Sequence, residues 1–483
     1  MTSPTPRNAS GTAPHPGAMP AEVFRAYDIR GIAPDPLSPE LVRAVGWSIA
    51  REARELGEER VAIGRDGRLT GPVLRDALAD GLAAGGVSVT DMGQLPTPIL
   101  YFAAREIGSG VMITGSHNPR DYNGLKISLA GETLFGSRIQ KLRERIEAHG
   151  WPATPVPSGA RDGIEPTSHD PHEDYVRDVV ARIAPGRRLR IAVDAGNGIT
   201  GTIAPRLYRE LGHDVIELHC EVDGRFPNHP PDTSVAESYR DLSRVVVDER
   251  ADLGFAFDGD GDRIGLVDGT GEIVWPDRFM MLYAEEILAR KPGAVIVHDV
   301  KCTRHLGAFI AARGGRAVMG RTGHSYIKKM LKDTGAALAG EMSGHMFFSD
   351  RWYGFDDALY AGARLLEILA ASPGSATARL AALPKGISTP EVRVEMREGA
   401  SGPFMQRLID ALPGAPGFAG ARLDTLDGVR AELPDGWALV RASNTSPGLT
   451  LRLEADSEAA LDSLVNDVRS LLVRLDPGLD VPL

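Results

Sequence analysis

One pattern of strands recurs three times along this chain of 483 residues and limits what the chain can fold into. Each copy has an apolar strand that ends in a polar turn, a second strand, and a third strand that runs into a distinctive loop. The copies span residues 60–119, 190–263 and 294–345, and helix-like segments such as 41–57 and 204–212 lie among them. Strands that alternate with helices are typical of parallel α/β sheets, so the repeat predicts three related α/β domains.

Composition outside the repeat sets the expected domain boundaries. Residues 1–20 are rich in proline, serine, threonine, alanine and glycine, which predicts a disordered extension. Linkers are expected in three turn-rich stretches, at 150–166, 267–277 and 371–386. A different segment with a helical tail follows the last linker. After the extension we therefore expect four domains, at 21–164, 165–272, 273–384 and 385–483.

The overall composition excludes several classes of protein. A formal net charge of -11 argues against non-specific binding of nucleic acid. The two cysteines, Cys220 and Cys302, are too few for a disulfide framework and favour a reducing, cytoplasmic setting. No apolar run approaches the ~18 residues that suggest a membrane span, and the N-terminus lacks the apolar segment of a secretory signal. We therefore expect a cytoplasmic protein without a nucleic-acid or membrane partner.

The third strand of each copy ends in an unusual polar loop: TGSHNP (114–119), DGDGDR (258–263) or GEMSGH (340–345). Ligands of open α/β sheets bind beyond the carboxyl ends of the strands. The three loops are therefore predicted to contribute to one shared site.

In the second loop, Asp258, Asp260 and Asp262 alternate with glycine after an apolar strand. Carboxylates this close repel one another unless a cation neutralises them. A calcium loop of the EF-hand type is disfavoured, because its sixth and twelfth positions would be Arg263 and Gly269 instead of Gly and Glu. The pattern predicts a Mg²⁺ site with positions left for a phosphate and water, and a solvated acidic turn is the alternative.

Ser116 is the candidate nucleophile of the first loop, but it does not fit a hydrolase. Neighbouring side chains on an extended strand point to opposite faces, so His117 is not expected to accept the proton of Ser116. The G-x-S-x-G pattern of a nucleophile elbow also fails, because Gly115 directly precedes the serine and Asn118-Pro119 stands where a helix would begin. If Ser116 takes part in the reaction, a group other than His117 must activate the molecule that reacts with it.

The turn DAGNGITG (194–201) is the strongest sign of another function. Gly196, Gly198 and Gly201 have the spacing of a dinucleotide-binding fingerprint, and Glu217 lies where a ribose-binding acid is expected. The other two copies of the repeat have no such fingerprint at this turn. A tight strand-to-helix turn is therefore favoured, and an NAD-binding dehydrogenase is the remote alternative.

Two further sets of residues suit a sugar phosphate. Glu341, Ser343 and His345 combine donors and acceptors that match sugar hydroxyls, although a plain polar turn is the alternative. The loop RASNTSPG suits a phosphate through its backbone N–H groups and through Arg441, Ser443, Asn444 and Thr445.

Six motifs, in order, resemble those of the α-D-phosphohexomutases: FRAYDIRG (24–31), TGSHNP (114–119), NGLKI (123–127), DGDGDR (258–263), GEMSGH (340–345) and RASNTSP (441–447). The resemblance covers about residues 21–483 and is closest to the bacterial phosphomannomutase/phosphoglucomutase type. It implies four domains around a central cleft, namely three related mixed α/β sheet domains and a smaller C-terminal α+β domain.

The resemblance also implies roles for individual residues. Ser116 is expected to be the phosphoserine and to share Mg²⁺ with Asp258, Asp260 and Asp262. Other catalytic positions are expected at Arg30, His117, Lys126, Arg263 and His324. The residues expected to bind substrate are Tyr27, Lys301, Glu341, Ser343, His345, Arg441, Ser443, Asn444 and Thr445. The general acid and base are not identified, and the candidates are His117, Lys126 and His324.

The implied reaction interconverts hexose 6-phosphate and hexose 1-phosphate through a hexose 1,6-bisphosphate intermediate, with glucose 1,6-bisphosphate as activator. By resemblance, the loop GEMSGH belongs to the type that accepts both glucose and mannose. Phosphoglucosamine mutase and a glucose-only phosphoglucomutase are the alternatives. We expect a monomer whose partner is a small phosphosugar.

Overall fold

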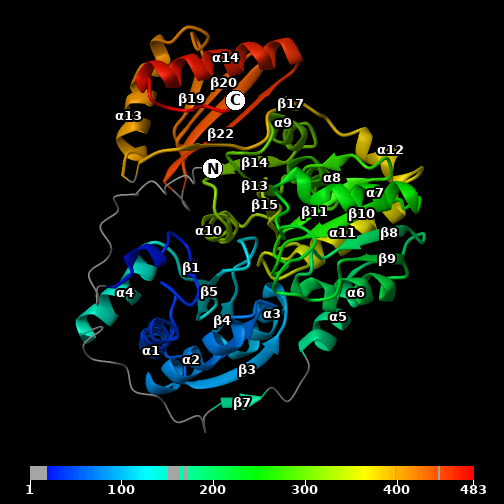
Figure 1. Cartoon of the computed structure of the whole chain (residues 1–483). Coiled ribbons are helices and arrows are strands. Elements are labelled where there is room, and N and C mark those ends of the chain that lie inside the picture. The colour runs from blue at the N-terminus through cyan, green and yellow to red at the C-terminus, as the bar shows by residue number, and fades with distance from the viewer. Residues whose placement is uncertain (1–18, 151–163, 167–170, 398, 444–446) are drawn as a thin grey trace, which may run out of the picture.

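The computed structural model describes residues 19–150, 164–166, 171–397, 399–443 and 447–483 (Figure 1). Apart from its last two residues, the predicted extension at 1–20 lies outside this range, and so do Asn444 and Thr445. Within the described residues, we find no helix with the length and apolar character needed to cross a membrane.

Domain I is built on a seven-stranded sheet. Its main path runs through β1 (Ile29–Ile32), β5 (Tyr122–Leu129), β4 (Gly110–Ile113), β2 (Arg60–Arg65), β3 (Ser88–Gln94) and β7 (Ile164–Pro166), and β6 (Glu132–Thr133) pairs with β5. Its helices are α1 (Pro39–Glu55), α2 (Gly71–Ala84), α3 (Thr97–Ile107) and α4 (Ser137–His149). Ser38 begins α1 as a typical N-cap, because its Oγ accepts the N–H of Leu41 at 3.2 Å and a proline follows it.

Domains II and III have smaller sheets. The five strands of domain II lie in the order β12 (Ile273–Val274), β11 (Ile264–Asp268), β10 (Leu253–Phe257), β8 (Arg190–Asp194) and β9 (Asp214–Leu218). Its helices are α5 (Pro171–Arg182), α6 (Ala204–Glu210) and α7 (Arg240–Asp248). The four strands of domain III are β14 (Arg316–Gly320), β13 (Val295–Asp299), β15 (Leu338–Gly340) and β16 (Met346–Phe348). Its helices are α8 (Pro276–Arg290), α9 (Arg304–Ala312), α10 (His324–Thr334), α11 (Ala358–Ala371) and α12 (Ala376–Ala381).

The three sheets share one core topology, which confirms the predicted repeat. In domain I, β2 pairs in parallel with β3 and β4, and β4 pairs antiparallel with β5. The order β9-β8-β10-β11 of domain II and the order β14-β13-β15-β16 of domain III have the same pairing. The fourth, antiparallel strand of each unit is not part of the predicted pattern. Each polar loop therefore connects the third strand to this fourth strand at the same end of its sheet.

The stretches predicted to be linkers contain short elements. Residues 267–277 include the end of β11 and the strand β12, which pair antiparallel, and 371–386 include α12. Residues 164–166 form β7 on the edge of the first sheet, whereas 151–163 lie outside the described residues. Elements of two to six residues are too short to show a periodic pattern, so turn-forming residues dominate the sequence signal.

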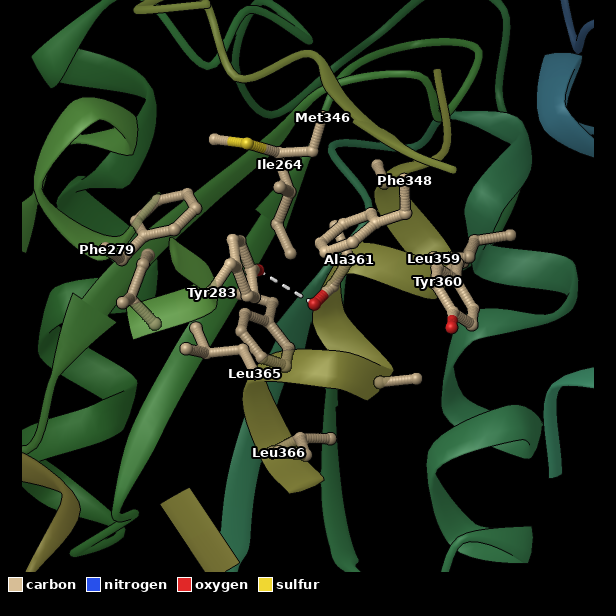
Figure 2. Packing of buried hydrophobic residues seen from close by; sticks show 14 of the residues in the cluster. Ile264, Phe279, Tyr283, Met346, Phe348, Leu359, Tyr360, Ala361, Leu365 and Leu366 are labelled. Atoms are coloured by element: carbon tan, nitrogen blue, oxygen red, sulfur yellow. Dashed lines mark hydrogen bonds between the residues drawn. The ribbon is translucent and has the colours of Figure 1, made fainter. Parts of the chain in front are cut away.

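Domains I, II and III are joined by one continuous hydrophobic core that includes Tyr101, Tyr208 and Phe348. Figure 2 shows part of it, where Tyr283 of α8 donates through its hydroxyl to the carbonyl oxygen of Ala361 in α11 at 2.8 Å. The rings of Tyr283 and Phe348 meet edge to face with 5.0 Å between their centroids. The core fixes the relative positions of the three polar loops.

Domain IV has an antiparallel sheet and a core of its own. The sheet runs β17 (Ile387–Ser388), β22 (Gly448–Ala455), β21 (Gly436–Ala442), β20 (Val429–Leu433) and β19 (Arg422–Asp424), with β18 (Val392–Glu395) on β22. Its helices are α13 (Ser401–Ala411) and α14 (Glu458–Leu475). It contacts domain III through a small apolar cluster of Val300, Trp437 and Leu439. Together the sheets confirm the expected fold class, with three related mixed α/β domains and a smaller C-terminal domain.

Candidate active site

The polar loops of domains I to III and one end of domain IV line a single cavity. Of the predicted site residues, the three aspartates are fully buried beside Ser116. Asn444 and Thr445 lie outside the described residues. All other residues predicted for the site line this cavity, namely Tyr27, Arg30, Ser116, His117, Lys126, Arg263, Lys301, His324, Glu341, Ser343, His345, Arg441 and Ser443.

Ser116 links domain I to the aspartate loop of domain II. Its Oγ donates to Oδ2 of Asp258 at 2.8 Å, and the serine is only 1% exposed. Its φ of 49° lies in the left-handed region, which residues other than glycine rarely adopt. The N–H of Ser116 donates to Oγ1 of Thr114 at 2.8 Å. The surrounding contacts thus hold this turn so that the serine hydroxyl faces a carboxylate of another domain.

Arg68, which is not among the predicted site residues, holds the loop that carries Ser116. Its side chain is buried and pairs with Asp66 at 3.2 Å. Its two terminal nitrogens donate at 2.7, 2.6, 2.6 and 2.9 Å to the carbonyl oxygens of Ser116, Asn118, Pro119 and Tyr122. A planar guanidinium holds its N–H donors in a fixed geometry, so this one side chain can bind four carbonyl oxygens and hold the loop in place.

The expected separation of His117 from Ser116 is wrong. Nδ1 of His117 lies 3.2 Å from Oγ of Ser116. The expectation assumed an extended strand, but β4 ends at Ile113 and Ser116 has left-handed backbone geometry. Burial, together with the positive charges of Arg263 and Arg30, lowers the pKa of His117 well below its usual range. The imidazole of His117 is therefore neutral at pH 7.

The three aspartates form a compact carboxylate cluster. One oxygen from each of Asp258, Asp260 and Asp262 lies within 4.8 Å of the others. Burial and the two neighbouring carboxylates raise the pKa of Asp258 well above its usual range. Within the described part of the chain, Oδ1 of Asp260 is buried and has no hydrogen-bond partner, and Oδ1 of Asp262 has only the long contact of 3.4 Å with the imidazole of His345. A buried oxygen without a partner in an all-oxygen donor set fits a hard divalent cation such as Mg²⁺, whose charge would favour ionised aspartates.

Lys126 neutralises part of this negative charge. Its Nζ lies 2.7 Å from Oδ2 of Asp260 and also contacts Asp262. Burial by itself would lower the pKa of Lys126, but the carboxylates of Asp260 and Asp262 raise it above its ordinary value. In this arrangement, Lys126 supplies positive charge beside the aspartates.

Positively charged side chains reach the cavity from both sides. Arg30 donates to Oδ1 of Asn118 in the serine loop at 2.8 Å, and Arg263 follows the aspartates directly. From the other side, Lys301 pairs with Glu391 at 2.9 Å and Arg441 pairs with Asp427 at 3.0 Å. The cavity can therefore accommodate negatively charged groups at two ends.

The loop GEMSGH is tied to the aspartate loop. Nδ1 of His345 lies 2.9 Å from Oε2 of Glu341 and 3.0 Å from Oγ of Ser343, and its Nε2 lies 3.4 Å from Oδ1 of Asp262. Burial would lower the pKa of His345, but Asp262 and Glu341 raise it to about 9. The positive imidazolium therefore joins the two acidic groups across the boundary between domains II and III.

His324, at the first position of α10, is oriented by a carboxylate that is not among the predicted residues. Its Nδ1 lies 3.0 Å from Oδ2 of Asp356, whose Oδ1 pairs with Lys328 at 2.8 Å. Burial lowers the pKa of His324, and Asp356 opposes this shift only in part. A neutral, oriented imidazole in the cavity can take up a proton.

Some cavity residues are absent from the prediction, including Thr322, Glu391 and Arg393. Glu391 and Arg393 lie in the sequence EVRVE, in which charged residues alternate with valines. This alternation places Glu391 and Arg393 on the same face of β18 and the residue before it, so it could have indicated both as site residues. Thr322 precedes α10 in a turn without a distinctive motif. Arg68 and Asp356 also lack a sequence signal, because a charged residue in a polar turn is usually exposed.

The fingerprint-like turn at 194–201 packs tightly against its surroundings. A Cβ atom on Gly198 would lie 3.0 Å from Cα of Gly259 in the aspartate loop, so the glycine permits a close backbone contact. Glu217 is in an ion pair with Arg209 at 2.6 Å. These contacts favour the predicted tight turn over a dinucleotide site.

The fold and these loops are those of one known family. Models of the phosphoglucomutase/phosphomannomutase alpha/beta/alpha domains I, II and III match residues 21–152, 173–271 and 275–386, and the model of the C-terminal domain matches 391–471. The chain therefore belongs to the phosphoglucomutase/phosphomannomutase family.

Individual relatives agree over nearly the whole length. The chain is 50% identical to a phosphomannomutase/phosphoglucomutase of Pseudomonas aeruginosa over 466 residues, which cover 96% of this chain and 98% of the relative. It is 47% identical to a phosphoglucomutase of Neisseria meningitidis over 465 residues, which cover 96% and 99%. A crystal structure of a family protein from Burkholderia thailandensis is similar with a TM-score of 0.87, 46% identity and coverage of 96% and 99%.

Proposed function

We propose that this protein is a phosphohexomutase that interconverts hexose 6-phosphate and hexose 1-phosphate through a phosphoserine at Ser116. The observation that carries the proposal is the 2.8 Å contact between Oγ of Ser116 and Asp258 inside a buried cluster of aspartates. The activities named for the relatives at 50% and 47% identity support the same reaction.

Asp258, Asp260, Asp262 and the serine oxygen would hold Mg²⁺, since they form an all-oxygen donor set. The ion, when bound, supplies positive charge to the phosphoryl group that is transferred. Arg30 and Arg263 line the same part of the cavity, so they can bind phosphoryl oxygens. The protein thus contributes mainly positioning and electrostatic stabilisation to phosphoryl transfer.

In the first half-reaction, a sugar hydroxyl attacks the phosphorus of phosphoserine 116. The new P–O bond forms to the sugar, and the bond from phosphorus to Oγ breaks. The hydroxyl proton of the sugar passes to a base, and an acid returns a proton to Oγ of Ser116. His117, Lys126 and His324 line the cavity and are our candidates for the general acid and base, and the two imidazoles are neutral. The product is hexose 1,6-bisphosphate, and glucose 1,6-bisphosphate would serve as activator by phosphorylating Ser116.

In the second half-reaction, the bisphosphate binds in the opposite orientation and returns its other phosphate to Ser116. The phosphate that is not reacting must be held away from the serine in both orientations. Lys301 and Arg441 line the cavity, and we infer that they bind this phosphate together with Ser443, Asn444 and Thr445 of the family motif. Glu341, Ser343 and His345 would bind the sugar hydroxyls between the two ends.

Glucose and mannose differ only at C2, so a pocket that binds the other hydroxyls would accept both sugars. We propose activity on both hexose phosphates, against the alternatives of a glucose-only enzyme and a phosphoglucosamine mutase. The test is a Mg²⁺-dependent assay with glucose 1-phosphate, mannose 1-phosphate and glucosamine 1-phosphate as separate substrates. We expect turnover of both hexose phosphates; turnover of only one, or a preference for the amino sugar, would contradict the proposal.

We also propose that the protein acts as a cytoplasmic monomer. One chain supplies the serine loop, the loop GEMSGH and Arg441, so a second subunit is not needed to form the cavity. Cys220 and Cys302 are free thiols, which suits a reducing compartment.

A further inference from the structure

Domain II contains a second cluster of metal-ligating side chains, separate from the catalytic cavity. Asp194 ends β8, His219 directly follows β9, and His229 lies in the loop beyond. Because β8 and β9 are parallel neighbours with Asp194 opposite Leu218, their carboxyl ends place Asp194 and His219 side by side. One carboxylate oxygen and one nitrogen from each imidazole all lie within 4.8 Å of one another.

His229 has the orientation of a metal ligand. Its Nδ1 lies 2.8 Å from the carbonyl oxygen of Pro230, which can only accept, so Nδ1 carries a proton. Its Nε2 lies 3.1 Å from Oδ2 of Asp194, whose other oxygen accepts the N–H of Gly196 at 2.8 Å. In the neutral ring, the lone pair of Nε2 points at a carboxylate, and either a proton or a metal ion must lie between them. Metal-bound histidines typically make this kind of second hydrogen bond to a carbonyl.

The distance between these two atoms fits a transition metal. Zn²⁺ binds nitrogen and oxygen ligands at about 2.0–2.1 Å in a tetrahedron, so neighbouring ligand atoms lie about 3.3 Å apart. The observed 3.1 Å between Nε2 of His229 and Oδ2 of Asp194 is close to this value.

His219 offers the second ring nitrogen. Its Nε2 is buried and has no hydrogen-bond partner among the residues that the structure describes. Oδ2 of Asp241 lies 3.5 Å away, which is longer than a normal hydrogen bond. This long contact leaves the buried Nε2 of His219 poorly satisfied, and a bound metal ion would provide a closer partner. Cys220 is not a ligand, because burial raises the pKa of its thiol to about 12 and its Sγ faces carbonyl oxygens.

We propose that Asp194, His219 and His229 bind a divalent transition-metal ion of the Zn²⁺ type, at a site distinct from the aspartate cluster beside Ser116. Two imidazoles and a carboxylate favour such ions, whereas Mg²⁺ prefers oxygen ligands. Asp241 or water completes the coordination.

The site would stabilise a contact between domains I and II. It fixes the loop 219–235 to the end of the sheet, and this loop reaches domain I, where the ring of Phe226 lies 5.0 Å from the guanidinium of Arg68. A Cβ atom on Gly224 would lie 2.8 Å from Cα of Arg68, so the two backbones are in close contact. Arg68 in turn holds the loop of Ser116.

The test is a titration of the full-length, chelator-treated protein with Co²⁺ in excess Mg²⁺. Co²⁺ reports nitrogen ligands and low coordination numbers by its visible absorption, and Mg²⁺ occupies the oxygen site. We expect one equivalent of Co²⁺ to produce a visible band that Zn²⁺ abolishes. His219→Phe and His229→Gln should each weaken this binding by about tenfold or more.

Two variants separate this site from other histidines. Asp262→Asn disrupts the aspartate cluster near His345 and should keep the band. His305→Gln is the matched control, because its Nε2 is also buried without a hydrogen-bond partner among the described residues, but it belongs to no metal-ligating cluster there. As a second readout, Zn²⁺ should raise the melting temperature of wild type and Asp262→Asn but not of His219→Phe. The proposal would be overturned if wild type shows no band or if Asp262→Asn loses the band. It would also be overturned if His219→Phe and His229→Gln both titrate with Co²⁺ as wild type does.

Discussion

At the scale of single residues, Arg68 shows how a buried side chain can control the reacting serine. It donates to four carbonyl oxygens of the loop that carries Ser116. We predict that Arg68→Lys lowers the free energy of unfolding by about 2–5 kcal/mol, because an ammonium cannot reproduce the fork and leaves buried carbonyls without donors. Turnover should fall as well, since the serine loop loses its fixed position. Urea unfolding and steady-state kinetics measure the two effects.

Arg65→Lys is the matched control for this prediction. Arg65 is in the same turn region and makes one long contact, at 3.4 Å, with the carbonyl oxygen of Asp66. We expect its stability and turnover to remain near those of wild type. Equal behaviour of the two variants would show that Arg68 has no special role in holding the loop.

Residues in distinctive motifs could be predicted from the sequence, whereas residues that position them could not. Ser116 and the aspartates lie in unusual patterns of serine, aspartate and glycine, so their chemistry is visible. Arg68 and Asp356 lie in ordinary polar stretches, and only the fold shows that they are buried. The contact between Ser116 and His117 could not be predicted, because the neighbouring residues do not indicate the left-handed backbone of Ser116.

At the scale of secondary-structure elements, β13 carries a buried histidine that makes stability depend on pH. Burial lowers the pKa of His298 to about 4, and its Nδ1 lies 3.1 Å from the carbonyl oxygen of Asp299. In the unfolded chain the pKa is about 6.5, so the unfolded state binds a proton first as the pH falls. The contribution of His298 is therefore fully present above about pH 6.5 and is lost between about pH 6.5 and 4, by up to about 3 kcal/mol.

We predict that His298→Gln removes this part of the acid sensitivity. Urea unfolding of both proteins across the same pH range is the measurement. The difference in unfolding free energy between wild type and variant should shrink as the pH falls from about 6.5 to 4. A difference that stays constant over this range would contradict the assignment.

The elements with strong periodic patterns were the predictable ones. The nine strands of the repeat follow from apolar runs bounded by turns, as in β2, β8 and β13. The fourth strand of each unit follows a functional loop and was not expected. The sequence predicts a linker at the end of β11 and at β12, because turn residues surround the two residues of β12.

At the scale of the whole molecule, domain IV is the part best suited to move. Its core is separate from those of the other domains, whereas domains I to III are joined by a common core in addition to a second core within domain I. Its apolar contact with domain III is a cluster of three buried residues. Beside this cluster, the guanidinium of Arg430 lies 3.7 Å from the ring centroid of Trp437 and donates to carbonyl oxygens of domain III. The sequence predicted four domains but could not show which of them are joined by a common core.

We predict that domain IV closes over the cavity when a sugar bisphosphate binds, because Arg441 then gains a phosphate ligand. Small-angle X-ray scattering with and without glucose 1,6-bisphosphate measures this. The radius of gyration should decrease with the ligand in wild type, and the decrease should be smaller in Arg441→Ala. An unchanged profile of wild type at saturating ligand would contradict closure.

The most direct test of the proposed mechanism is the intact mass of the protein after incubation with glucose 1,6-bisphosphate and Mg²⁺. We predict one added phosphoryl group per chain in wild type, located on Ser116 by peptide mapping. If that group carries an isotopic label, added hexose monophosphate should take the label from Ser116, because each turnover transfers this group to the sugar and returns the sugar's other phosphate to the serine. Ser116→Ala should neither gain the group nor turn over substrate. Equal phosphorylation of Ser116→Ala, or full turnover by this variant, would contradict the claim that Ser116 carries the phosphate.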